Sequence, residues 1–334
     1  MSTPRRRVTV HDVAREARVS RGTVSRVVNG ERYVSTEARK AVEAAILRTG
    51  YVPSRAARTL VRQRAQAVGF VVHEPHAMFV DDPNIGRLLL GANRALSAAD
   101  HQMPTLIFDS DEDSQRIVRY LGGGVVDGVI LVSAREHDPI TDAVRNLGLA
   151  TAFIGNPRNE MPWVGIDNED AAHSITSRLL ETGRRKVGMI AAGMDRDSGS
   201  DRYAGFRRAL GDRFDEGLVV RVDHYSFADG VTGMRELLAR CPDVDGVFAA
   251  SDALAAGAID TLNEAGRRVP QDVGIVGFDD SGWAQRCRPQ LSTVRQPAEA
   301  LGAAAAALVL AQLEGRPVVS GSLLETPVVW RDSA

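Results

Sequence analysis

The sequence has little cysteine and no long apolar run, and both shortages exclude classes of protein. Cys241 and Cys287 are the only cysteines in 334 residues, and their separation fits neither a zinc site nor a redox pair. No apolar run approaches the roughly 18 residues that a membrane-spanning helix needs. The basic residues 5–7 are not followed by the apolar segment of a secretory signal. We therefore expect a protein of the reducing cytoplasm, not of the membrane.

Net charge is also nearly absent, but the balance is uneven along the chain. The formal net charge is −2. Residues 1–66 contain 15 Lys and Arg against 5 Asp and Glu, whereas residues 67–334 contain 26 against 38. A basic head on an acidic body is typical of proteins that bind nucleic acid through one part. Charge alone also fits a solvated basic face, so the local pattern must decide.

Residues 9–30, TVHDVAREARVSRGTVSRVVNG, contain two short helical patterns joined by a tight turn. Ser20 is placed to cap the second helix by accepting a backbone N–H, and Gly30 can end it with a positive φ. A third helical pattern follows over residues 35–50. A purely structural three-helix unit would not need Thr23, Ser25, Arg26 and Asn29 crowded on one exposed edge. We predict a helix-turn-helix whose polar edge enters a DNA major groove.

Residues 51–66, YVPSRAARTLVRQRAQ, link this head to the rest of the chain. Pro53 is compatible with a break in the chain before a short helix. That helix would carry Ala57 and Leu60 on one side and leave Arg55 available to phosphates. It is too short to be stable alone. A simple charged linker is the alternative.

From Val68 onward short apolar strands alternate with amphipathic helices, which predicts parallel sheets covered on both faces. The strand patterns are VGFVV, PTLIFD, DGVILVS, ATAFIG, KVGMIAA, GLVVRVD, DGVFAAS and VGIVGFDD. They allow one barrel or two doubly wound lobes. The interruption at residues 155–170 favours two lobes, because it places a loop and an extra extended piece midway.

These motifs resemble the LacI/GalR family of bacterial transcription repressors over residues 9–60, and the similarity continues into VGIVGFDDSGWAQRCRPQLSTVRQP. The resemblance implies the bilobed fold of periplasmic sugar-binding proteins, with the chain crossing between lobes near 162–165 and 290–293. It implies base reading by Arg21, Gly22 and Arg26. It implies a hinge helix that orders on operator DNA, where Leu60 enters the minor groove and kinks the duplex. The predicted DNA-binding residues are Thr9, Arg21, Gly22, Thr23, Ser25, Arg26, Asn29, Tyr33, Ser35, Arg55, Ala57 and Leu60.

The predicted effector site lies in the cleft between lobes, because ligands of open α/β sheets bind beyond the carboxyl ends of the strands. Asp279 and Arg202 follow strand patterns, can hold sugar hydroxyls by charge-assisted hydrogen bonds, and match two effector-binding positions of the family. Ser251 stands where the family often has asparagine. The other candidates are Asp252 and Ser133 at strand ends, and Trp283 and Tyr225, for which stacking on a ligand and packing in the core are equally open.

Residues 73–84, HEPHAMFVDDPN, depart from the family's short turn. Asn84 lies near the place of a common stacking aromatic. Phe79 is the candidate to replace that aromatic; the alternative is that the segment covers the cleft.

Motifs that suggest catalysis or metal binding fail on inspection. The glycines of LGGGVVDG precede a strand, whereas a phosphate loop follows one. The segment DRDSGSDRYAGF lacks the glycine and final glutamate of a calcium loop. HEPH has the wrong spacing for a zinc protease. We predict no enzyme, no cofactor and no metal.

The sequence therefore predicts a DNA-binding regulator with three parts. These are a helix-turn-helix domain over 1–53, a hinge over 54–66, and a core over 67–334 whose N-lobe is about 67–163 and 293–322 and whose C-lobe is about 164–292 and 323–334. The expected partners are pseudo-palindromic operator DNA, a mono- or oligosaccharide effector and a second copy of the chain, because one recognition helix reads too few bases. Two alternatives remain: a regulator controlled by a partner protein, as in carbon-catabolite control, and a sugar-binding protein without a regulatory role.

Overall fold

The structure, a computed structural model, describes residues 8–28, 33–51, 64–133 and 138–334. The chain divides into two units, residues 1–65 and 66–334. We call the first unit the head and the second the body.

The head contains three helices around a small apolar core. They are α1 Val10–Ala17, α2 Arg21–Val28 and α3 Thr36–Thr49. Val13, Val24 and Val42, one from each helix, are fully buried. The hydroxyl of Ser20 accepts the backbone N–H of Thr23 at 3.1 Å, so the predicted cap of the second helix is confirmed.

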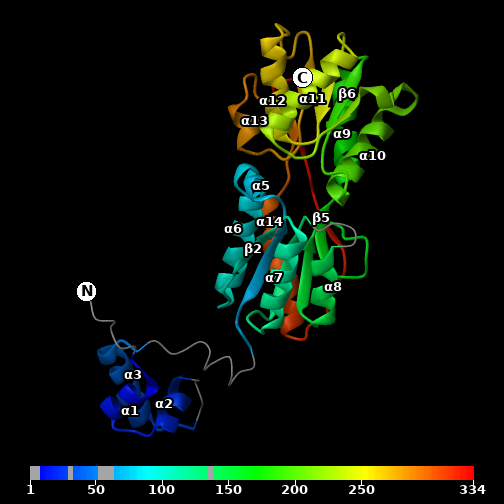
Figure 1. Ribbon diagram of the computed structural model, residues 1–334. Coiled ribbons are helices and arrows are strands. Elements are labelled where there is room, and N and C mark those ends of the chain that lie inside the picture. The colour runs from blue at the N-terminus through cyan, green and yellow to red at the C-terminus, as the bar shows by residue number, and fades with distance from the viewer. Residues whose placement is uncertain (1–7, 29–32, 52–63, 134–137) are drawn as a thin grey trace. The chain divides into compact units, whose positions relative to one another are not determined.

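The body has two α/β lobes, each built on its own parallel sheet (Figure 1). The N-lobe sheet has the order β11-β5-β4-β3-β1-β2 and the C-lobe sheet the order β7-β6-β8-β9. Each lobe has its own apolar core. The prediction of two lobes is therefore confirmed, and the alternative of a single barrel is excluded. All eight strand patterns of the sequence form strands of these sheets.

The elements of the N-lobe are β1 Val68–His73, α5 His76–Asp81, α6 Pro83–Ala98, β2 Thr105–Phe108, α7 Asp111–Gly122, β3 Gly128–Val132, α8 Pro139–Asn146, β4 Ala150–Ile154, β5 Trp163–Ile166, α14 Ala298–Leu313 and β11 Ser322–Leu324. Those of the C-lobe are α9 Asn168–Glu181, β6 Val187–Ala191, α10 Asp197–Leu210, η1 Gly211–Arg213, η2 Glu216–Leu218, β7 Val219–Arg221, α11 Phe227–Arg240, β8 Gly246–Ala249, α12 Asp252–Glu264, β9 Gly274–Val276, α13 Gly282–Arg286, β10 Thr293–Val294 and β12 Val328–Val329.

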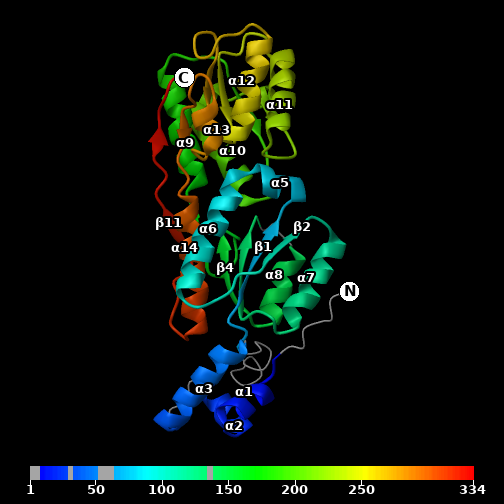
Figure 2. The same ribbon diagram turned by 90° about the vertical axis from the view of Figure 1, so that its left-hand side faces the viewer.

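The chain crosses between the lobes three times, and α14 and β11 return it to the N-lobe late in the sequence (Figures 1 and 2). Strand β5 is hydrogen-bonded to β4 and β11 in the N-lobe sheet. Strand β10 pairs with β12, and the bridge from Val276 to Ser292 joins that segment to the C-lobe. The first two crossings therefore fall a few residues later than the sequence suggested, and β11 as a whole belongs to the N-lobe.

Helices α6 and α14 are far apart in the sequence but pack closely against each other in the N-lobe. Gly91 and Gly302 lie at the crossing, where an added Cβ would come within 1.9 Å of the Glu299 carbonyl and 2.0 Å of the Leu88 carbonyl, respectively. Only glycine lets these backbones meet. The C-terminal part of the chain thus supports the wall of the interlobe cleft.

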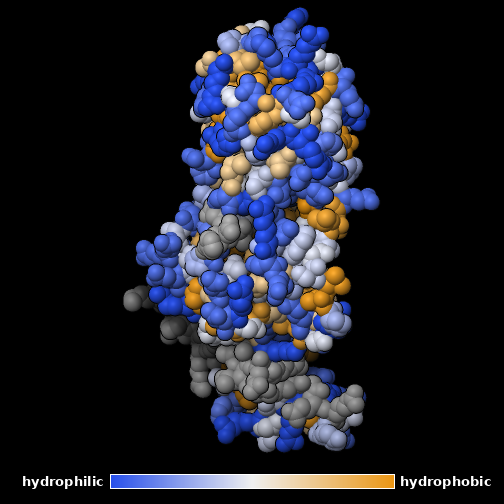
Figure 3. All heavy atoms as spheres, turned by 90° about the vertical axis from the view of Figure 1, so that its right-hand side faces the viewer, coloured by the Kyte–Doolittle hydropathy of each residue, from blue (hydrophilic) through white to orange (hydrophobic). Residues whose placement is uncertain are grey.

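The face of the body in Figure 3 is mostly hydrophilic, with small apolar patches scattered over it. In the described part of the chain, no helix has both the length and the apolar character needed to cross a membrane.

Candidate functional site

A cavity of about 110 Å³ lies between the two lobes of the body, at the carboxyl ends of strands from both sheets. We call it the central cavity. Of the predicted effector residues it brings together Arg202, Asp279, Tyr225 and Ser133. Its other polar lining residues are Glu74, Asp82, Asn84, Asn168, Arg196, Asp197, Ser198 and Gln296.

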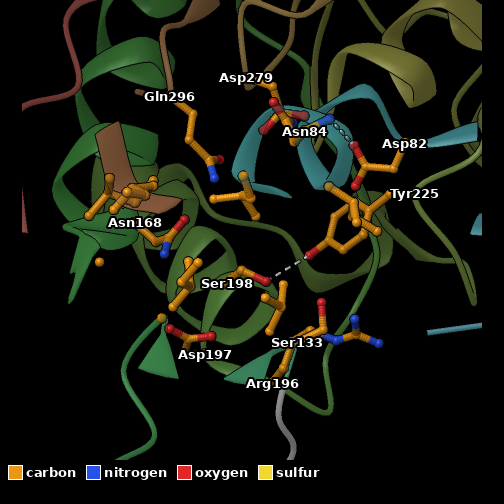
Figure 4. A pocket seen from close by; sticks show the side chains of 18 of the residues that line it. Asp82, Asn84, Ser133, Asn168, Arg196, Asp197, Ser198, Tyr225, Asp279 and Gln296 are labelled. Carbon is orange, nitrogen blue, oxygen red and sulfur yellow. Dashed lines mark hydrogen bonds between the residues drawn. The ribbon is translucent and has the colours of Figure 1, made fainter. Parts of the chain in front are cut away.

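One end of the cavity gathers Asp82, Asn84 and Asp279 (Figure 4). The Asp82 carboxylate caps α6 by accepting the N–H of Asn84 at 2.8 Å, and Pro83 at the first helical position favours that start. The Asn84 side chain hydrogen-bonds to Asp279, whereas its Oδ1, buried, has no hydrogen-bond partner among the described residues. A buried acceptor without a donor is costly, so this end calls for a ligand that donates.

Burial also raises the pKa values of the acidic side chains at this end of the cavity. It raises the pKa of Asp82 to about 6 and holds the pKa of Asp279 well above its usual range, against the opposing effect of Arg202. Backbone geometry adds a second constraint, because Asp279 has a φ of 117°. Few side chains other than asparagine and aspartate tolerate a positive φ.

The guanidinium of Arg202 contacts hydrogen-bond acceptors, an aromatic ring and a carboxylate of the body. Its guanidinium donates to Asn168 at 2.9 Å and to the Ala250 carbonyl at 2.6 Å. It lies over the ring of Phe278 at 3.7 Å and 3.8 Å from the Asp279 carboxylate. The side chain therefore serves both to brace the C-lobe and to balance the charge of Asp279.

Toward the other end, groups from the two lobes bind each other directly. Arg196, which precedes α10, forms a buried ion pair with Glu74, which follows β1. Burial opposes the charge on Arg196, but Glu74 and Asp195 outweigh it and raise the pKa of Arg196. The Asp197 carboxylate accepts the N–H of Asn156 at 2.6 Å, and burial raises the pKa of Asp197. These contacts hold the lobes together in the present arrangement.

Four predicted effector residues do not line the central cavity. Phe79 packs against the N-lobe core, because residues 76–81 form helix α5 instead of a loop. Ser251 is buried and caps α12 by accepting the N–H of Leu254. Trp283 stacks on Phe227 outside the cavity. Ser251 and Trp283 instead border a smaller space next to Asp82, Tyr225 and Asp279, so their contact with an effector stays a prediction.

Asp252, the fourth, is a structural residue. Its carboxylate is fully buried and accepts the Ser281 N–H and the Thr293 hydroxyl, each at 2.6 Å. The bonds tie the start of α12 to the segment that leads into the crossing. A strand-end aspartate at a helix start satisfies the backbone here rather than a ligand.

The buried Asp252 should make stability depend on pH. Burial raises its pKa from 3.8 to about 7, so the folded state binds the extra proton between these values. The stabilisation is complete below pH 3.8 and is lost as the pH rises to about 7. In Asp252→Asn the amide can accept from Ser281 and donate to Thr293, so we expect this fall in the unfolding midpoint to become smaller, with the remainder due to Asp82 and Asp279, whose pKa values burial also raises. Thermal denaturation of both proteins across this range checks it; identical pH profiles would contradict the assignment.

Several lining residues were missed by the sequence analysis, although weak signals for them existed. Asp82 stands in the Asp-Pro pair that marks a helix start. Arg196 and Asp197 lie six and five residues before Arg202, the one effector candidate that the sequence analysis names in this segment. Both segments follow strands, so the sequence predicts that they lie at the carboxyl edge of a sheet. Asn168 and Gln296 lie beside the lobe crossings, whose positions required the structure.

The head presents the predicted DNA-binding residues that the structure describes. Arg21, Gly22, Ser25 and Arg26 are exposed on α2, and an added Cβ on Gly22 would meet nothing closer than 3.6 Å. The absence of a side chain at position 22 therefore has no packing reason. Asn29, Arg55, Ala57 and Leu60 lie outside the described residues.

Three of the other predicted head residues have local partners. The Thr9 hydroxyl donates to Asp12 at 2.7 Å, the Thr23 hydroxyl lies 2.9 Å from that of Ser20, and Ser35 caps α3. Tyr33 is 93% exposed. A phosphate contact from the Thr9 hydroxyl would have to replace its bond to Asp12.

Comparison with known proteins agrees with both units. Residues 9–54 match the bacterial regulatory proteins of the lacI family, and residues 176–334 match the periplasmic binding protein-like domain. The HTH-type transcriptional regulator CelR of Thermobifida fusca is 41% identical, over 98% of this chain and 99% of that protein. A CelR–cellobiose complex is 38% identical with a TM-score of 0.77, covering 98% of this chain and 100% of that one. The lac repressor dimer bound to operator and an anti-inducer shares the fold, with 24% identity, a TM-score of 0.86 and coverage of 98% and 99%.

A helix-turn-helix head with a bilobed, binding-protein-like body defines a DNA-binding transcription regulator. The chain belongs to the lacI family of bacterial regulatory proteins.

Proposed function

We propose that the protein is a cytoplasmic, dimeric repressor whose affinity for its operator is controlled by an uncharged sugar bound in the central cavity. The observation that carries the proposal is the excess of acceptors there. Four carboxylates, from Glu74, Asp82, Asp197 and Asp279, face two guanidiniums, and Asn84 adds an unpartnered oxygen. A polyhydroxylated ligand supplies donors to such a site.

The same charges argue against a phosphorylated sugar. Arg196 is paired with Glu74 and Arg202 with backbone and side-chain acceptors, so neither guanidinium is available to a phosphate without breaking buried bonds. The relative solved with cellobiose supports a neutral sugar as the class of effector.

Calorimetry with mono- and disaccharides, run beside their phosphates, tests this proposal. We expect binding of a neutral sugar and weaker binding of its phosphate. A chain that binds no sugar would favour the partner-controlled alternative.

On the DNA side, we propose that Arg26 reads a base and that the hydroxyl residues of the head position it on the phosphates. Arg26→Ala is expected to relax preference at one base pair of each half-site, by about 1–3 kcal/mol if the contact is bidentate. Thr23→Ala should weaken binding to all sequences alike. Binding of duplexes carrying every base at each position measures both; equal losses on all sequences from Arg26→Ala would contradict base reading.

Coupling between sugar and DNA is proposed to run through the hinge predicted from the sequence. A sugar can shift the protein between states only by its difference in affinity for them. The bonds from Glu74 to Arg196 and from Asn156 to Asp197 join the lobes across the cleft, so a ligand beside them changes how the lobes sit. A marginal hinge helix responds to a coupling of about 1–3 kcal/mol.

A further inference from the structure

The loop that follows β4 in the N-lobe reaches across the cleft to the first turns of α10 in the C-lobe. The backbone N–H of Asn156 donates to the Asp197 carboxylate at 2.6 Å. Two residues later, the guanidinium of Arg158 donates to the Ser200 hydroxyl at 2.9 Å and to the Asp201 carboxylate at 2.7 Å. We call these two bonds of Arg158 the rim contact, because Arg158, Ser200 and Asp201 do not line the central cavity.

The backbone of this loop is bent toward α10. Arg158 has a φ of 52°, a left-handed conformation that glycine, asparagine and aspartate adopt with less strain than arginine. Its N–H donates to the Asn156 side chain at 2.9 Å, which closes a tight turn. Gly155, with a φ of 104°, lies so near α10 that an added Cβ would come within 3.0 Å of the Asp197 carboxylate. The bonds of the Arg158 side chain to α10 explain why an arginine is held in this strained conformation.

Helix α10 presents its partners for the loop on one face. Ser200 and Asp201 lie three and four residues after Asp197, which places the three side chains on the same side of the helix. The buried pair of Arg196 and Glu74 joins the same end of the helix to the N-lobe. The start of α10 is therefore connected to the N-lobe twice, once inside the central cavity and once at the rim of the cleft.

The two connections differ in exposure. The side chains of Arg158 and Asp201 are 60% and 32% exposed, whereas those of Arg196 and Glu74 are 7% and 10% exposed. Water and salt weaken an exposed pair, and breaking a buried pair costs more because a buried charge is left alone. Removal of the rim contact leaves no such charge, so the fold should tolerate it.

We propose that Arg158 is a positioning residue for the central cavity, because its bonds to Ser200 and Asp201 hold the two lobes together at the rim of the cleft. The cavity takes groups from both lobes, such as Asn84 from α6 and Asp279 from the C-lobe (Figure 4). When these groups are held in place before a sugar binds, less of its binding free energy is needed to close the lobes. The role toward the sugar rests on the proposed function, whereas the contact between the lobes does not.

Hydrogen–deuterium exchange on the full chain without sugar tests the rim contact. The Asn156 N–H reports on the lobes because its acceptor lies in the other lobe. The Gly155 N–H donates to the Val164 carbonyl of the same lobe at 2.9 Å and is the internal control. We expect Arg158→Asn and Asp201→Asn to speed exchange at Asn156 about two- to fivefold, the range of an exposed ion pair, and to leave Gly155 unchanged.

Asparagine at position 158 removes the guanidinium but tolerates the left-handed backbone. Arg145→Asn is the matched control, because Arg145 is 55% exposed and pairs with Asp142 inside the N-lobe; it should leave exchange at Asn156 unchanged. The double variant of Arg158 and Asp201 should exchange no faster than the faster single variant, since both changes remove the same ion pair. Higher salt should speed exchange at Asn156 in the unaltered chain and much less in Arg158→Asn.

The outcomes separate the rim contact from the proposed function. Unchanged exchange at Asn156 in folded Arg158→Asn and Asp201→Asn overturns the proposal, and so does equal acceleration at Gly155, which would show that the loop itself loosens. Melting temperatures establish folding. Saturating cellobiose should slow exchange at Asn156 in the unaltered chain, because a sugar held by both lobes keeps them together. If neither cellobiose nor glucose slows it, the result counts against a sugar in the central cavity and leaves the rim contact to the measurements without sugar.

Discussion

Asp279→Asn is expected to weaken sugar binding by about 10- to 100-fold while operator binding without sugar stays the same. The carboxylate lies 3.8 Å from Arg202 and is almost fully buried. Losing one hydrogen bond to a charged group costs about 1.5–3 kcal/mol. The amide also places a donor beside the guanidinium and the Asn84 side chain. Calorimetry and operator titration on the same preparation measure both effects.

Asparagine is the right replacement here because the backbone is unusual. With φ at 117°, alanine would add backbone strain to the loss of the carboxylate, and an effect on folding would be mixed with one on binding. Asp260→Asn, at an exposed position on α12, is the matched control and should bind sugar normally. If Asp279→Asn folds and still binds and responds fully, the assignment of the central cavity is wrong.

Arg202 cannot serve as the same kind of test. Its guanidinium holds Asn168, the Ala250 carbonyl and Gln296. Truncation would leave several buried acceptors unpaired and lower stability along with sugar binding. A loss of sugar binding in such a variant would therefore not distinguish a direct contact with the sugar from a structural role of Arg202.

Operator binding is expected to fall steeply with salt. Residues 1–66 carry 15 basic against 5 acidic residues, and a dimer presents two such heads. If six to ten phosphates are neutralised, affinity drops by about 10³- to 10⁵-fold between about 50 and 200 mM salt. Sugar binding on the acidic body should change little over the same range, which provides the control. A flat salt dependence would contradict the phosphate contacts assigned to the head.

Much of the fold could be predicted because it depends on local patterns. Helical spacing and the Ser20 cap mark the head, and the apolar strands alternating with helices mark the two sheets. The lobe crossings were placed less well. Strand β5 is short, and it lies in the N-lobe sheet between β4 and β11, of which β11 comes more than 150 residues later in the chain.

Part of the site can also be predicted from local patterns. Arg202 and Asp279 follow strands, so their place at the carboxyl edge could be inferred. Strand-end position cannot distinguish a ligand-facing carboxylate from one that satisfies the backbone, as Asp252 does. Phe79 was misplaced because helix α5 turns its side chain toward the N-lobe core. The sequence places Asn84 near the position of the family's stacking aromatic, but its buried, unpartnered oxygen is a feature of the fold that the sequence does not show.

The most direct test of the account measures operator affinity with and without a sugar that calorimetry has shown to bind. A duplex selected from random sequences and labelled for fluorescence anisotropy would serve, at one fixed salt concentration. We predict that saturating sugar changes the affinity of the unaltered chain by about 5- to 150-fold, and that Asp279→Asn needs far more sugar for the same change. Equal operator affinity at zero and saturating sugar would contradict control of DNA binding from the central cavity.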